Sequence, residues 1–241
     1  MFKFRRRMEN IQKYKTTDKM ADLISADYSL LQVMSRFGLS LGFGDKTVKE
    51  VCEQNGVDCS TFLTVVNFIS EGFSRLNGNK EDISIPGLVD YLKQAHKYFL
   101  DFSFPAIHRK LIEAIDCSQD EIAFLMLKIF DEYCREVRRH MEFEERTVFK
   151  YVDELLAGRV RDNYPISTFS KHHEQVGEKL TELKNIIIKY CPAKANEHLL
   201  NAALFDIYAC EEGLESHCKV EDYIFVPAIL NLERRMMDHE K

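Results

Sequence analysis

The sequence contains no tryptophan and has few turn-forming residues, with 10 glycines and 5 prolines in 241 residues. A chain so poor in glycine and proline is a weak candidate for an all-β fold and favours long helices. It also lacks any run near the roughly 20 apolar residues that a membrane-spanning helix needs. The basic start at residues 1–7 is not followed by the apolar core of a secretory signal. We therefore expect neither a membrane protein nor a secreted one.

The cysteine content and the net charge further restrict the compartment and the partners that we expect for this protein. The 7 cysteines are an odd number, and no two of them are spaced as Cys-x-x-Cys. This pattern suits free thiols in a reducing cytoplasm better than a disulfide framework, so we expect a cytoplasmic protein. The net charge of −6 argues against nucleic acid as a partner.

Breaks in the helical pattern divide the chain into two expected domains. Short helical patterns interrupted by glycine fill residues 15–76, and residues 77–82 form a polar, linker-like stretch. Long helical patterns joined by short turns then follow at 86–116, 119–157, 166–191 and 194–238. Such a succession is typical of an antiparallel four-helix bundle. We predict an all-α protein with a small helical N-terminal domain (15–76) and a four-helix bundle (83–238).

Histidine and glutamate interrupt the apolar faces of two expected bundle helices. His140 and Glu144 continue the three- and four-residue steps of the apolar stripe in the second long helix. His217 and Glu221 do the same in the fourth. A His-x3-Glu pair is weak as a motif, because glutamate is common in this sequence. The burial of the two glutamates is the stronger signal, because an inward carboxylate is costly unless it is paired or bound to a metal.

The other two helices each place one histidine on the same inward side. His96 lies on the stripe of the first helix, and spacing allows either His172 or His173 on the third. No lysine or arginine lies on these stripes, so a metal is the simplest source of compensating positive charge. Imidazole and carboxylate donors together suit iron or manganese and do not exclude zinc. Two bridging carboxylates, four imidazoles and a solvent-derived bridge would leave one position open on each of two octahedral ions.

Four sequence fragments resemble the hemerythrin-like di-iron proteins: residues 96–100, 139–145, 170–174 and 216–227. Within these, the chain most resembles the repair-of-iron-centres proteins, in which a small helical domain precedes a hemerythrin-like bundle. The resemblance implies two iron ions with an oxo or hydroxo bridge. It favours His173 over His172, because Gly177-Glu178 stands at the matching distance. The ligands that it implies are His96, His140, Glu144, His173, His217 and Glu221.

The same resemblance implies repair of iron–sulfur clusters damaged by nitric oxide or oxidative stress, with the protein as iron donor. Its implied partners are damaged iron–sulfur proteins and the small gases nitric oxide and oxygen. The main alternative is a hemerythrin-like module that binds or senses oxygen or nitric oxide. Gly177 stands where oxygen carriers have a further histidine, and this disfavours a pure storage role.

Three questions stay open at the level of sequence. A metal-free helical interaction protein, with its His–Glu pairs as buried hydrogen-bonded groups, is a third interpretation. The role of the N-terminal domain is also open. Many members of the family have adjacent cysteines in the stretch that corresponds to residues 37–44, and this chain has none there. The sequence also leaves open whether the protein is an enzyme and which oligomer it forms, a homodimer included.

Overall fold

The computed structural model describes residues 14–71, 83–115, 120–159, 166, 178–190 and 194–239. Helices make up the regular structure of these residues, and the only extended pairing among them is an isolated bridge between Lys19 and Thr47. The predicted all-α fold is confirmed. None of the helices in the described ranges is long and apolar enough to cross a membrane.

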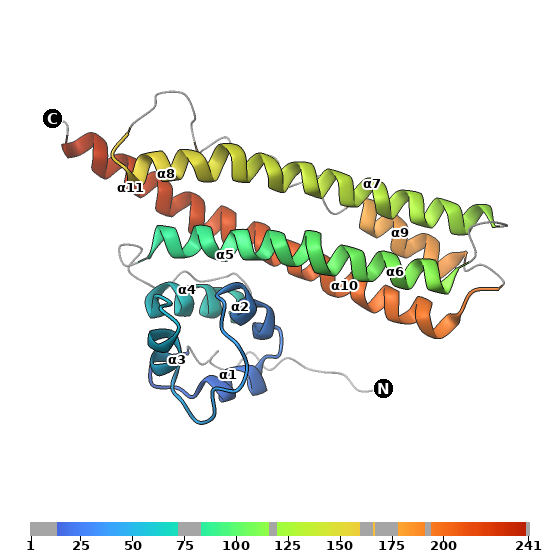
Figure 1. The fold of residues 1–241 in the computed structure, drawn as a ribbon, viewed down its shortest axis with the longest axis horizontal. Coiled ribbons are helices and arrows are strands. Elements are labelled where there is room, and N and C mark those ends of the chain that lie inside the picture. The colour runs from blue at the N-terminus through green and yellow to red at the C-terminus, as the bar shows by residue number, and fades with distance from the viewer. Residues whose placement is uncertain are drawn as a thin grey trace. The chain divides into compact units, whose positions relative to one another are not determined.

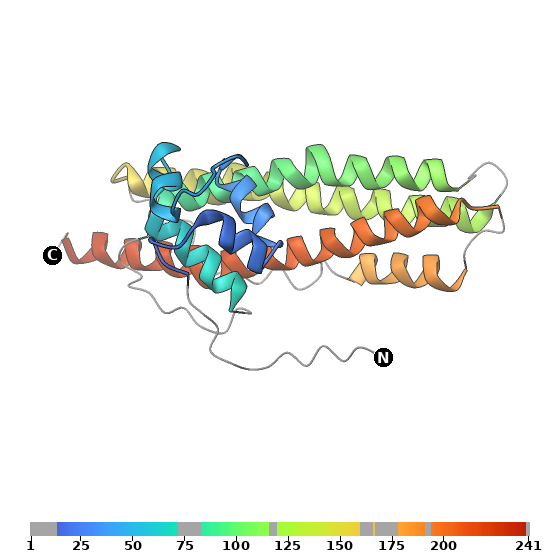
Figure 2. The ribbon, with the colours of Figure 1, turned by 90° about the horizontal axis from the view of Figure 1, so that it is seen from below.

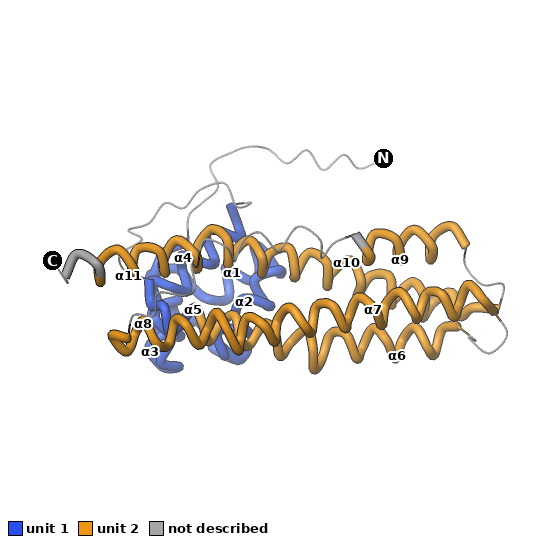
Figure 3. The backbone as a smooth tube through the Cα atoms, turned by 90° about the horizontal axis from the view of Figure 1, so that it is seen from above, with its two compact units in different colours: residues 1–88 blue, residues 89–241 orange. Residues whose placement is uncertain are grey.

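The backbone divides into two compact units, residues 1–88 and 89–241 (Figure 3). The predicted linker, 77–82, lies outside the described residues. The domain limits expected from sequence, 15–76 and 83–238, therefore stay a prediction.

Four short helices lie within residues 14–71 of unit 1, drawn in blue to cyan in Figure 1. They are α1 (Met20–Ala26), α2 (Leu30–Arg36), α3 (Val48–Gln54) and α4 (Cys59–Ser70). Thr47 caps α3 through a capping box in which Glu50 accepts a hydrogen bond of 2.7 Å from the Thr47 backbone. Buried side chains such as Phe62 and Val65 form the core of the unit.

The described residues of unit 2 form three long helical rods and one shorter helix. The first rod runs through α5 (Ile85–Lys97), whose first turn belongs to unit 1, then η1 (Tyr98–Ser103) and α6 (Phe104–Ala114). The second comprises α7 (Glu121–Phe143), η2 (Glu144–Phe149) and α8 (Lys150–Leu156). The third comprises α10 (Glu197–Val220), η4 (Glu221–Phe225) and α11 (Val226–His239), and α9 (Glu178–Lys189) is the shorter helix.

The rods and α9 pack as a bundle around an apolar core. Helix α10 packs along α6, and α9 lies beside both α7 and α10 (Figures 1 and 2). Apolar side chains fill the centre, among them Phe104, Leu111, Phe130, Leu183 and Leu214. The predicted bundle is thus confirmed, and its rods end within three residues of the predicted limits. The start predicted for the third helix, at residue 166, precedes a stretch outside the described residues.

Each rod changes from α to π geometry and back again within its length, which periodicity did not predict. The π segments η1, η2 and η4 contain 6, 6 and 5 residues. A π turn closes its hydrogen bonds one residue later than an α turn, is rare, and is often found at functional sites.

Candidate metal centre

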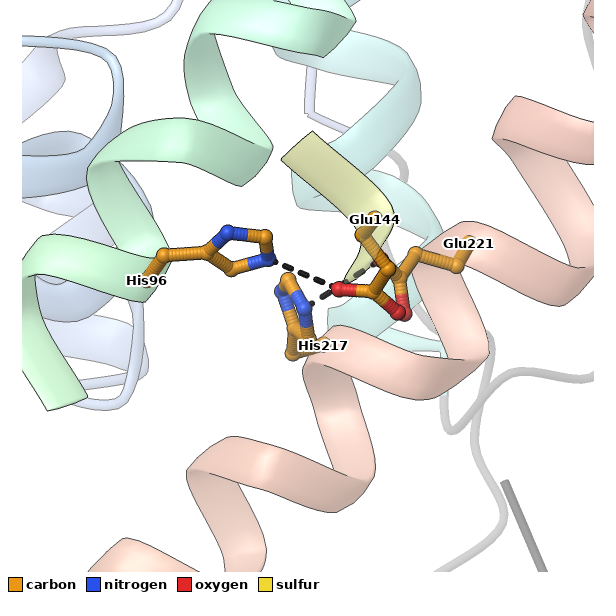
Figure 4. A group of neighbouring side chains, drawn as sticks. All are labelled: His96, Glu144, His217 and Glu221. Atoms are coloured by element: carbon orange, nitrogen blue, oxygen red, sulfur yellow. Dashed lines mark ion pairs between the residues drawn. The ribbon is translucent and has the colours of Figure 1, made fainter. Parts of the chain in front are cut away.

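A cluster of buried histidine and glutamate side chains lies inside the bundle, where the rods change to π geometry. His96, Glu144, His217 and Glu221 each offer one ligand atom, and these atoms all lie within 4.8 Å of one another. Their side chains point toward a common centre from three different rods (Figure 4). The exposed fractions of the four residues are 0 to 2 %. Four polar groups are therefore held together out of contact with solvent.

The Glu144 carboxylate lies between two imidazoles. Its Oε2 atom is 3.0 Å from Nε2 of His96, and its Oε1 atom is 2.8 Å from Nε2 of His140. His140 is the more accessible of these two imidazoles, with a side-chain exposed fraction of 20 %. Each carboxylate oxygen therefore faces a different imidazole.

The second glutamate repeats the local geometry of the first. Oε1 of Glu221 is 3.3 Å from Nε2 of His217, four residues earlier on the same helix. The backbone N–H of Glu144 donates to the His140 carbonyl, and that of Glu221 donates to the His217 carbonyl. Each His–Glu pair thus spans the last α turn before a π segment, which places both side chains on one face of the rod.

His96 is held through both ring nitrogens. Its Nδ1 atom, on the opposite side of the ring from Glu144, is 2.9 Å from Oε1 of Glu145. Burial alone would lower the pKa of His96. The hydrogen bond to Glu144, the charges of Glu144 and Glu221, and the hydrogen bond to Glu145 outweigh burial and raise it.

The negative potential of the two carboxylates reaches a neighbouring thiol. Burial, followed by the charges of Glu221 and Glu144, raises the pKa of the Cys218 thiol. The two carboxylate charges therefore add to the effect of burial in opposing a further negative charge beside the cluster.

Aromatic rings form the walls of the cluster. Phe149 stacks on the His96 ring with centroids 5.6 Å apart, and Phe99 meets the edge of the His217 ring at 6.2 Å. Phe225 packs against Phe149 at 5.9 Å. Because these rings exclude water, charges inside the cluster interact more strongly than they would at the surface.

The structure brings together five of the six predicted ligands. Four form the compact cluster, and His140 joins it through Glu144. His173 lies outside the described residues, as does His172, so the choice between them is untested. The assignment of the six residues as ligands stays a prediction.

Sequence reasoning missed Glu145. Its side chain is 46 % exposed, so it falls off the apolar stripe that marked Glu144. Its partner lies 49 residues earlier on another rod, and helix periodicity cannot reveal a pair so distant in sequence.

The donor set of the cluster fits a metal ion. Two carboxylates close together in an apolar interior repel each other unless one takes up a proton or positive charge lies between them. Imidazole and carboxylate donors of this kind suit first-row metals such as iron, manganese and zinc.

Comparison with protein families agrees with this chemistry. Residues 87–229 match the family model described as "Hemerythrin HHE cation binding domain". The matched range includes every residue of the cluster, together with His140 and Glu145. A search of curated proteins found no significant match.

Proposed function

Because the chain belongs to the hemerythrin HHE cation-binding family, we propose that it holds two iron ions and restores damaged iron–sulfur clusters. The family match and the His/Glu cluster identify a metal-binding hemerythrin-like bundle. Iron, the dinuclear centre and the repair role are the proposal. They rest on the geometry of the cluster and on the resemblance described above.

The observation that carries the dinuclear centre is the orientation of Glu144. Its two oxygens face His96 and His140 separately, so the carboxylate could serve two ions, with His96 holding one and His140 the other. His217 and Glu221 would complete the first side. His173 would join His140 on the second, as the resemblance implies.

Within the site, the residues of the chain have distinct tasks. The imidazoles bind as neutral donors, and the two carboxylates offset much of the charge of the ions. Phe99, Phe149 and Phe225 keep bulk water from the buried side. A bound iron pair supplies redox chemistry and exchangeable positions for small gases.

Iron donation is supported by the uneven burial of the ligands. His140 is 20 % exposed, whereas His96, His217 and the two glutamates are almost fully enclosed. An acceptor or a chelator can therefore approach one ion from the His140 side. This asymmetry favours a centre that releases iron to damaged iron–sulfur proteins, which are the partners we propose.

A second function, reversible binding or sensing of oxygen or nitric oxide, is favoured by the aromatic walls. Apolar rings next to open metal positions suit small neutral gases better than charged substrates. The two functions differ in one measurable property, because donation requires the loss of iron to an acceptor and gas sensing does not.

We place the protein in the cytoplasm as part of the same proposal. Cysteines 52, 59, 134, 210 and 218 are free thiols in the described part of the chain. Several unpaired thiols in one chain are typical of a reducing compartment.

The test combines metal analysis with cluster repair. We expect protein purified without added metal to contain about two irons per chain and an absorption band of an oxo-bridged pair, both lost in His140→Ala and Glu221→Ala. An iron–sulfur enzyme inactivated by nitric oxide should regain activity when the iron-loaded protein is added, while the protein loses iron. Reversible gas binding without iron loss would instead establish the sensor. A colourless protein whose stability is unaffected by chelators would refute both.

A further inference from the structure

Glu145 is a half-exposed glutamate with a buried partner. Its Oε1 atom lies 2.9 Å from Nδ1 of His96, whose side chain is 1 % exposed. A carboxylate only accepts hydrogen bonds, so Nδ1 must carry the proton and donate. The bond thus links the surface of η2 to the interior of the first rod.

The opposite nitrogen of the same ring faces the cluster. Nε2 of His96 is 3.0 Å from Oε2 of Glu144. Glu144 and Glu145 are consecutive residues, yet they contact opposite sides of one imidazole. Because the His96 ring lies between Glu145 and the cluster, Glu145 is placed outside the set of ligands.

We propose that Glu145 is a positioning residue for the metal centre, because its carboxylate fixes the tautomer and orientation of His96. With the proton held on Nδ1, the Nε2 lone pair is directed at the cluster. An anionic acceptor also makes the imidazole a stronger donor to a metal. This inference rests on the proposed metal site, and it adds a residue that only the three-dimensional structure reveals.

An ordinary surface ion pair would not have this effect. Most exposed pairs contribute little, because water replaces either partner at low cost. Here one partner is enclosed by protein, so its N–H needs an acceptor from the protein. Stacking of His96 on Phe149 at 5.6 Å keeps the ring in its plane, and Glu145 selects which nitrogen faces inward.

The first test reads the hydrogen bond directly, without any metal-dependent activity. In nitrogen-15 NMR spectra of the histidine rings, zinc-loaded wild type should show a protonated, slowly exchanging Nδ1 and a zinc-bound Nε2 for His96. In Glu145→Ala the Nδ1 proton should exchange rapidly with solvent. An unchanged His96 signal in this variant would overturn the inference.

The second test measures zinc affinity by competition with a chromophoric chelator. Glu145→Ala should bind zinc about 10- to 100-fold more weakly than wild type, with faster release. Glu145→Gln keeps an accepting oxygen without the charge, so it should fall between the two. The matched control is Glu142→Gln, which removes a carboxylate 43 % exposed on the same rod, paired with the surface residue Arg146. It should bind like wild type.

The outcomes separate this inference from the proposed function. If wild type binds no metal, the proposed site fails, and the metal-free NMR spectra still report whether Glu145 holds Nδ1. If wild type binds metal and all three variants bind equally well, the positioning role alone fails. Circular dichroism of each variant verifies that the bundle is folded, and Glu145→Gln remains as a test should Glu145→Ala not fold.

Discussion

Replacement of Glu221 by glutamine should change stability in opposite directions with and without metal. Glu221 and Glu144 are both fully buried, with ligand atoms no more than 4.8 Å apart. At an effective dielectric constant of about 20, two like charges at that distance repel by roughly 3.5 kcal/mol. Below the raised pKa of His96, the positive charge of its imidazole offsets part of this repulsion in the metal-free protein. We therefore expect Glu221→Gln to stabilise the metal-free form by about 1–3 kcal/mol.

With metal bound, the effect of Glu221→Gln on stability reverses, and the substitution should be destabilising. A metal at about 1,000 times its dissociation constant stabilises the folded state by about 4.1 kcal/mol, and this gain is lost when a ligand is removed. The loss exceeds the gain of about 1–3 kcal/mol from relieving the repulsion, so the variant should be less stable than wild type by roughly 1–3 kcal/mol. For a chain of this size, each kcal/mol corresponds to roughly 2–4 °C in the unfolding midpoint. Glu221→Gln should unfold several degrees above wild type in chelator and several degrees below it in excess zinc.

The assay is thermal unfolding followed by circular dichroism, in chelator and in zinc. Glu215→Gln is the matched control, because Glu215 lies on α10 with a side chain 62 % exposed and pairs with Lys219. It should change the free energy of unfolding by no more than about 1 kcal/mol in either condition. If Glu221→Gln destabilises the protein equally in both conditions, the carboxylates are structural hydrogen-bonding groups, and the electrostatic reasoning is wrong.

Three further perturbations test other parts of the structure. The pKa of His96 is raised above its ordinary value of 6.5. Protonation of His96 therefore stabilises the metal-free protein fully below pH 6.5, and this stabilisation disappears as the pH rises through the raised pKa. Zinc must displace the same proton, so zinc affinity should fall as pH is lowered toward 6.5, and titration calorimetry should detect proton release. Phe149→Ala removes a fully buried ring that stacks on His96. It should lower the free energy of unfolding, measured with denaturant, by about 3–5 kcal/mol and should accelerate the loss of zinc to a chelator. An unchanged rate of zinc loss would refute the role of the ring in excluding water. Thr47→Ala breaks the capping box of α3 and should destabilise unit 1 by about 1 kcal/mol, with faster amide exchange in α3 and no change in zinc binding.

Helix periodicity was sufficient to predict the rods and most of the cluster. His140 with Glu144 and His217 with Glu221 are local pairs, four residues apart on one face, so sequence spacing alone places them together. The cost of burying a carboxylate then indicates a cation. His96 was predicted in the same way, from its position on an apolar stripe.

Features that depend on contacts between rods could not be predicted. The π segments do not follow from residue type, since the stretch Glu144–Phe149 has an ordinary helical composition. The bond between His96 and Glu145 joins residues on different rods, and an exposed glutamate carries no signal in an amphipathic pattern. The third-helix histidine stays a prediction because His173 lies outside the described residues.

The distribution of the cluster along the chain limits when the protein can acquire its metal. His96 comes from the first rod, Glu144 from the second, and His217 and Glu221 from the last, so about half of the sequence separates the outermost members. A nascent chain emerging from the ribosome presents at most two of these side chains until the final rod has been synthesised. A metal held by all four side chains of the cluster can therefore bind only after the final rod has been synthesised and packed.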